Sequence, residues 1–270
     1  MTSTNRIHRR LREIQKNKRK ALITFVTAGD PSLAVTKKLV SALESGGVDI
    51  VELGIPFSDP MADGPVIQKA SERALARGAT LKKVLRLVRE VRRSSQIPIL
   101  LMGYYNPILA YGLARYAKDA AKAGVDATLV VDLPPEESQP LDSELKKTGI
   151  DLIYLLTPTS DAERIRKVAS RARGFIYFVS ITGITGARLR SEQEVKKKVL
   201  EIRRHTKLPI AIGFGISKPE QARAMSKIAD GVVIGSALVK LIEKHAKSKN
   251  LSSYVEKFVG GLKSSLVLIH

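Results

Sequence analysis

The sequence VDIVELGIPFSDPMADGP, residues 48–65, contains an apolar run, an acid and a loop rich in proline and glycine. The run leads through Val51 into Glu52, and a second carboxylate, Asp63, follows in the loop. A carboxylate buried at a strand end is costly unless it is paired or used chemically. The two carboxylates can act as acid and base on a shared ligand. A structural acid that caps the next helix is the alternative, and these residues alone leave both open.

The same succession of a short apolar run and a longer helical pattern recurs along the chain. Strands are predicted at 22–27, 48–53, 98–103, 127–131, 151–156, 175–180, 209–213 and 231–234. Helices are predicted at 4–17, 32–45, 66–77, 81–93, 107–123, 136–147, 161–172, 191–205, 218–227, 236–246 and 251–265. Nearly continuous Val, Ile, Leu and Phe in the strands is typical of a parallel sheet that is covered on both faces.

Eight strand–helix units in 270 residues predict an α/β protein, a (β/α)8 TIM barrel with an extra N-terminal helix. We expect one domain over 1–270, with a basic N-terminal helix in 1–20, the barrel in 22–246 and a C-terminal helix at 251–265. A doubly wound open sheet is the runner-up. The turn after its first strand is normally a glycine-rich dinucleotide turn, and residues 27–30 read Thr-Ala-Gly-Asp instead.

Several boundaries follow from local chemistry. Asp30 followed by Pro31 is typical of a helix start, with an N-cap and a proline in the first turn. Pro98 and Pro209 are expected to start strands, where a missing N–H is tolerated. Glycines expected to end helices are Gly46, Gly47, Gly124 and Gly149.

Composition excludes several classes of chemistry. The chain has no cysteine, and its four histidines are scattered, so disulfides, thiolate nucleophiles and a histidine metal site are not expected. No apolar run approaches the roughly 18–20 residues that span a bilayer. The basic N-terminus lacks the apolar core of a signal peptide, which favours a cytoplasmic protein.

The formal net charge is +20. Most basic residues fall on amphipathic patterns such as Leu81, Val84, Leu85, Val88 and Val91, where the charges would occupy the solvated face. Aromatic residues are few, and none alternates with the charges as a stacking surface for nucleic acid would. The charge therefore favours a solvated outer surface over nucleic-acid binding.

The predicted carboxyl ends of the strands carry most of the polar residues, and active sites of such barrels lie there. Three glycine-rich turns follow the last three strands, at 182–186, 213–217 and 235–237. Glycine lets backbone N–H groups approach an oxyanion closely, and helix N-termini favour negative charge. No lysine ends a strand, which disfavours a Schiff-base aldolase. The residues predict acid/base chemistry on a small phosphorylated substrate, without a metal or redox cofactor.

The motifs resemble the tryptophan synthase α subunit family. The resemblance lies in FVTAGDP (25–31), ELGIPFSDPMADGP (52–65), GITG (183–186), GFGIS (213–217) and GSA (235–237), in order and over essentially the whole chain. It implies cleavage of indole-3-glycerol phosphate to indole and glyceraldehyde 3-phosphate in tryptophan biosynthesis.

The resemblance also implies roles for individual residues. Glu52 would be the acid/base residue, with a pKa raised by an apolar pocket, and Asp63 would stay ionised and accept the indole N–H. Asp132 would help to position this region of the site, and a purely structural role is the alternative. Residues implied to bind the rest of the substrate are Phe25, Tyr104, Leu129, Leu155, Tyr177 and Thr185, with phosphate at Gly186, Gly215, Gly235 and Ser236; Thr185 would lie on a closing lid.

Family membership further implies a β subunit that holds pyridoxal phosphate and receives the indole, in an α2β2 assembly. This chain would hold no cofactor. Residues implied at the partner interface are Pro56, Asp59, Pro60, Asn106 and Pro107. Two other functions stay open: an isomerase on a related phosphate-binding barrel, and a basic nucleic-acid-binding or regulatory protein without catalysis.

Overall fold

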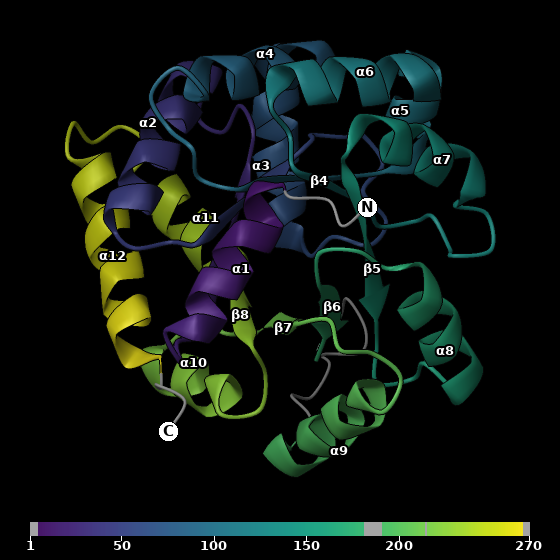
Figure 1. Cartoon of the computed structure of the whole chain (residues 1–270). Helices are drawn as coiled ribbons and strands as arrows, with labels where there is room; N and C mark the ends of the chain where they lie inside the picture. Colours follow the sequence, from purple (N-terminus) through teal and green to yellow (C-terminus); the bar gives the residue numbers. More distant parts are fainter. Residues whose placement is uncertain (1–4, 181–190, 214, 267–270) are drawn as a thin grey trace.

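Eight parallel strands close into a barrel in the computed structural model, which describes residues 5–180, 191–213 and 215–266 (Figure 1). The strands are β1 (Ala21–Thr27), β2 (Ile50–Gly54), β3 (Ile99–Gly103), β4 (Ala127–Val130), β5 (Asp151–Leu156), β6 (Ile176–Val179), β7 (Ile210–Gly213) and β8 (Gly231–Ile234). Each strand pairs with the next in sequence, and β8 returns to β1 with Ala21 opposite Gly231. The predicted barrel is therefore confirmed, and the open doubly wound sheet is excluded.

Helices cover the outside of the barrel and connect successive strands (Figure 1). They are α1 (Arg6–Lys16), α2 (Leu33–Ser45), α3 (Pro65–Ala76), α4 (Leu81–Val91), α5 (Tyr105–Tyr111), α6 (Leu113–Ala123), α7 (Gln139–Thr148), α8 (Ala162–Arg171), α9 (Glu192–Arg203), α10 (Pro219–Ser226), α11 (Ser236–Lys244) and α12 (Leu251–Ser265). The apolar stripe predicted on α4 is buried, which leaves its lysines and arginines on the outside. None of the helices in the described ranges combines the length and apolar character needed to cross a membrane.

Alternation along each strand divides the apolar core into two layers. On β1, Ile23 and Phe25 belong to the cluster inside the barrel, whereas Leu22 and Val26 pack in the layer between strands and helices. Both layers are buried, which explains why the strands are apolar at almost every position. Glu52 on β2 lies beside Phe25 in the strand register, and therefore on the inner face.

Helix α1 covers the amino-terminal end of the barrel. Its buried face, formed by Ile7, Leu11 and Ile14, joins the cluster of residues inside the barrel. Its polar side chains contact two buried carboxylates at the starts of strands. Arg6 pairs with Asp126, just before β4, at 3.0 Å, and His8 Nε2 lies 2.7 Å from Asp151, the first residue of β5. With that end covered, the carboxyl ends of the strands are left for a ligand.

Two predicted boundaries are wrong. The helix predicted at 107–123 is two helices, α5 and α6, because Gly112 adopts a φ of +91° that a continuous helix does not permit. Asp30 does not cap α2; Ser32 does, accepting a hydrogen bond from the N–H of Val35. The Asp30 carboxylate instead accepts hydrogen bonds from the guanidinium of Arg73 on α3 at 2.8 and 2.9 Å.

Candidate active site

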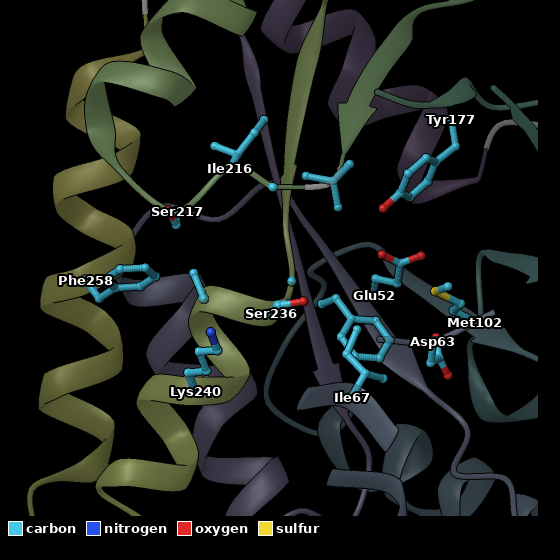
Figure 2. Close-up of a pocket in the computed structure, with 15 residues that line it drawn as sticks. Glu52, Asp63, Ile67, Met102, Tyr177, Ile216, Ser217, Ser236, Lys240 and Phe258 are labelled. Atoms are coloured by element: carbon cyan, nitrogen blue, oxygen red, sulfur yellow. The ribbon is translucent and has the colours of Figure 1, made fainter. Parts of the chain in front are cut away.

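A cavity of about 480 Å³ lies at the carboxyl ends of the strands (Figure 2). Its walls come from β1, β2, β3, β6 and β8, the loops after β2, β7 and β8, and the outer helices α3, α11 and α12. Residues lining it are Phe25, Glu52, Asp63, Ile67, Met102, Tyr177, Gly215, Ile216, Ser217, Val233, Gly235, Ser236, Ala237, Lys240 and Phe258. Strand and loop residues far apart in sequence therefore share one space.

Glu52 is the deepest ionisable residue in this cavity. Its side chain is completely buried, and neither carboxyl oxygen has a hydrogen-bond partner among the described residues. Burial raises the pKa of Glu52 to about 8, and the nearby charge of Asp63 contributes to the rise. The carboxyl group is therefore mainly protonated at neutral pH, in agreement with the expected upward shift.

Asp63 is held over the cavity by the short loop between β2 and α3. The Asp63 N–H donates to the carbonyl of Pro60 at 3.0 Å, and the Gln68 side-chain amide donates to the Asp63 carbonyl at 2.8 Å. Burial raises the pKa of Asp63 to about 6, and a hydrogen bond from the Tyr104 hydroxyl opposes that rise. Asp63 is therefore mainly ionised at pH 7, when Glu52 is mainly protonated. Pairs with such separated ionisation are typical of acid/base sites.

Backbone amides gather at the other end of the cavity. Gly215 has a φ of +77°, and Gly235 lies at the N-cap of α11 without a side-chain cap for the helix. The first N–H groups of a helix have no partner within it, and the helix dipole favours an anion there. Figure 2 shows Ser236, the first residue of α11, beside the same cavity that Glu52 and Asp63 face. This end of the cavity suits an anionic group.

The structure brings most of the predicted site residues together. Phe25, Glu52, Asp63, Tyr177, Gly215, Gly235 and Ser236 all line the cavity. Tyr104 lines a small adjoining recess that shares Phe25 and Asp63 with it. Thr185 and Gly186 lie outside the described residues.

Two predicted substrate contacts lie elsewhere in the described part of the chain. Leu129 is fully buried within the cluster inside the barrel, and Leu155 packs partly buried against that cluster. Neither is among the residues that line the cavity. Their contact with substrate stays a prediction.

Sequence reasoning missed several lining residues. These are Ile67, Met102, Val233, Lys240 and Phe258, whereas Ile216, Ser217 and Ala237 lie within the predicted glycine-rich turns. Most are apolar residues that resemble ordinary core positions, and Phe258 reaches the cavity only because α12 packs against α11. Lys240 could have been predicted from the sequence, because it follows Ser236 by four residues and therefore lies on the same face of α11.

The predicted interface residues lie at the outer rim, where their exposure differs. Pro56 and Pro60 are buried within this chain, Pro107 is half-buried, and Asp59 and Asn106 are exposed. The carboxylate of Asp132 accepts a 2.8 Å hydrogen bond from the N–H of Tyr105 in the first turn of α5, and its support of the site stays a prediction. Among the described residues, no cluster of His, Asp or Glu side chains is placed to hold a metal ion.

A closed parallel barrel, with a protonated and an ionised carboxyl group in a cavity that also contains glycine-rich turns, is typical of a barrel enzyme of the acid/base class. The model of the family described as "Tryptophan synthase alpha chain" matches residues 11–266. The chain belongs to the tryptophan synthase alpha chain family, and it is a lyase that cleaves indole-3-glycerol phosphate to indole and glyceraldehyde 3-phosphate.

Individual relatives resemble it over nearly its whole length. The tryptophan synthase alpha chain of Geobacter sulfurreducens is 56% identical over 254 residues, which are 94% of this chain and 96% of that one. The crystal structure of the subunit alpha from Legionella pneumophila is 38% identical, with a TM-score of 0.91 over 97% of this chain and 98% of that one. A chain of tryptophan synthase from M. tuberculosis, in an aminoacrylate-bound form, is 29% identical, with a TM-score of 0.87 over 98% of this chain and 100% of that one.

Proposed function

We propose that Glu52 and Asp63 carry out the cleavage in this protein. The observation that supports this assignment is their convergence: both carboxyl groups line one cavity, with the amide-rich turns at its other end. If the indole ring of the substrate lay between Phe25 and Tyr177, the ring would be near the two acids and the phosphate group of the substrate would be near Ser236. Leu129 and Leu155 belong to the same proposed indole pocket, and Thr185 to its closing lid.

In the proposed reaction the Glu52 carboxyl group donates its proton to indole C3. Protonation turns the ring into an iminium, and Asp63 accepts the ring N–H and stabilises the positive charge. The Glu52 carboxylate then removes the proton of the hydroxyl on the carbon attached to C3. The bond between that carbon and C3 breaks, its electron pair neutralises the iminium, and the products are indole and an aldehyde. Glu52 ends protonated, as it began, which suits a group with a pKa of about 8.

The phosphate group is proposed to lie against Gly215, Gly235 and Ser236, with Gly186 completing the seat. Amides at the start of α11 would donate to the phosphate oxygens, with the helix dipole adding to the attraction. Holding the phosphate fixes the distance between the ring and the two acids. Binding energy remote from the reacting bond then serves catalysis.

We also propose a partner, a tryptophan synthase β subunit in an α2β2 assembly, which holds the pyridoxal phosphate while this chain holds no cofactor. Support comes from two exposed apolar residues near the predicted interface: Met61 is 74% exposed and Leu109 is 52% exposed. They lie on the loop after β2 and on α5, the segments that carry Asp59 and Asn106. A cytoplasmic location remains a prediction of the sequence.

The deciding experiment measures indole release from indole-3-glycerol phosphate by the wild type, Glu52→Gln and Asp63→Asn, each with and without a β subunit. Both variants keep the side-chain shape, so we expect native circular dichroism. Loss of a proton-transferring group costs about 10²–10⁴-fold in rate. Turnover near that of the wild type in either variant would overturn the assignment for that residue.

A further inference from the structure

The far end of the cavity, beyond Ser236, contains one cationic side chain. Lys240 is the only lysine or arginine among the described residues that line the cavity, although the chain as a whole carries 46. Figure 2 shows its ammonium rising from α11 toward the cavity, on the side of Ser236 away from Asp63. Phe258 of α12 forms an apolar wall at the same end.

The position of Lys240 follows from helix geometry. Ser236 and Lys240 are four residues apart on α11, so their side chains lie one above the other on the same face. In a helix a side chain leans toward the N-terminus, which directs Lys240 toward the turn that Ser236 begins. A group bound at the N-terminus of α11 is therefore within the reach of a lysine side chain.

The ammonium group of Lys240 also lacks an ion-pair partner among the described residues. In the described ranges no carboxylate forms an ion pair with Lys240, whereas Glu243 on the same helix pairs with Arg73 at 2.7 Å. The rest of the cavity needs a cation, because Asp63 is its other mainly charged group at neutral pH and is negative. If Lys240 were absent, a phosphate dianion would be attracted only by the backbone amides and the dipole of α11, and the one full charge in the cavity would repel it.

We propose that Lys240 is a phosphate-binding residue of this site, which supplies the positive charge that the backbone amides lack. The proposal rests on the proposed placement of the phosphate at Gly235 and Ser236. Lys240 contacts the phosphate equally in the bound substrate and in the transition state. Its loss therefore weakens substrate binding and leaves the rate of the chemical step unchanged. Its contribution is that of a partly solvated ion pair, since the lysine side chain is itself exposed.

The test measures binding without turnover. Two probes are titrated calorimetrically: indole-3-propanol phosphate, which cannot be cleaved, and indole-3-propanol, which lacks the phosphate. We expect Lys240→Met to weaken binding of the phosphorylated probe about 3- to 10-fold, and to leave binding of the other probe unchanged. Lys240→Arg should retain most of the affinity, and the salt dependence of binding should be smaller in Lys240→Met.

Lys244→Met is the matched control, because Lys244 is exposed on the same helix one turn further on and does not line the cavity. It removes the same charge from the protein and should leave both affinities unchanged. Equal affinities of Lys240→Met and Lys244→Met for the phosphorylated probe would overturn the proposal. So would equal weakening of both probes in Lys240→Met, which indicates a distorted pocket.

These outcomes are separate from the fate of the catalytic assignment. Normal turnover by Glu52→Gln contradicts the proposed acid but leaves the Lys240 measurement valid. Phosphate bound away from the start of α11 would appear as an affinity of Lys240→Met for the phosphorylated probe equal to that of the wild type, and it would contradict the placement of Lys240 in the site. In indole-release assays, Lys240→Met should raise KM by the same factor and leave kcat nearly unchanged.

Discussion

The hydroxyl of Tyr104 accepts a hydrogen bond from the backbone N–H of Ala62 at 3.0 Å. A residue that follows β3 thereby fixes the loop that follows β2, and the same hydroxyl donates to the carboxylate of Asp63. Tyr104 also contacts the ring of Phe57 in this loop, with ring centroids 5.2 Å apart. The position and the ionisation of Asp63 therefore depend on a side chain from a neighbouring strand end.

Removal of that hydroxyl should change the pH profile of the reaction. Tyr104→Phe takes away the hydrogen bond that favours ionised Asp63, so the pKa of Asp63 should rise further above about 6. Activity that needs the ionised carboxylate is lost as the pH falls through this pKa. We expect the acidic limb of kcat/KM to move to higher pH, with about tenfold lower activity near neutral pH. Tyr111→Phe, which loses an outer hydrogen bond to Asp119 at 2.7 Å, should keep the wild-type profile.

The buried carboxyl group of Glu52 should make the protein less stable at high pH. Its folded pKa of about 8 exceeds the ordinary value, so the folded state binds the proton more tightly than the unfolded chain does. The contribution of this carboxyl group to the free energy of unfolding is fully present below about pH 4.5 and is lost as the pH rises through about 8. Glu52→Gln should therefore unfold at higher urea concentration than the wild type at pH 9, with the difference closing near pH 5.

Asp63→Asn provides a comparison for this stability measurement. The pKa of Asp63 is raised only to about 6. The difference in the free energy of unfolding between Asp63→Asn and the wild type should therefore be smaller than for Glu52→Gln and should develop at lower pH. A Glu52→Gln variant that is less stable than the wild type across pH 5–9 would contradict the assigned burial of an unpaired carboxyl group.

The absence of a side chain at Gly54 should be necessary for the shape of the cavity. A Cβ at this position would lie 2.5 Å from the Cζ of Phe25, which lines the cavity. Gly54→Ala should displace the ring, cost about 1–3 kcal/mol of stability and weaken substrate binding. Gly64→Ala is the control, since a Cβ there meets nothing within 4 Å. Urea unfolding and KM for indole-3-glycerol phosphate measure the two effects, and equal values for the two variants would show that the ring tolerates the methyl group.

The amino-terminal end of the barrel should affect stability without affecting chemistry. Asp126 is buried and pairs with Arg6 at 3.0 Å and Arg92 at 2.9 Å, and it accepts a hydrogen bond from the N–H of Ile99. Asp126→Asn should destabilise the fold by about 3–5 kcal/mol, because it leaves a buried arginine without its counter-ion. The pH profile of indole release should stay that of the wild type at a temperature where the variant is folded. A changed profile would contradict this separation of the two ends.

Removal of an exposed pair serves as the reference for that measurement. Arg86 and Glu90 lie one turn apart on α4 with 3.3 Å between their charged groups; Arg86 is exposed and Glu90 is partly exposed. Glu90→Gln should change stability by about 0.5 kcal/mol or less. Only a clearly larger loss in Asp126→Asn supports the burial argument.

Much of the barrel could be predicted from local patterns. Strand β8 was predicted at its observed bounds, and the α4 stripe from Leu81 to Val91 is buried as expected. Gly124 and Gly149 end helices in the left-handed conformation that glycine adopts at low cost. The wrong boundaries at Asp30 and Gly112 have a shared cause. More than one cap or backbone conformation satisfies the local sequence at each of them, and at Asp30 the contact with Arg73 holds the carboxylate away from the helix start.

Periodicity and residue type were enough to predict the alternation of strands and helices, the carboxylates of Glu52 on β2 and Asp63 in the loop after it, and the glycine turns. Which residues share a cavity, and how they ionise, depends on packing between elements far apart in the sequence. Lys240 and Phe258 join Glu52 and Asp63 because helices packed outside the barrel reach its mouth. The separated pKa values of the two acids arise from burial and from the Tyr104 hydroxyl, and both exist only once the chain has closed into a barrel.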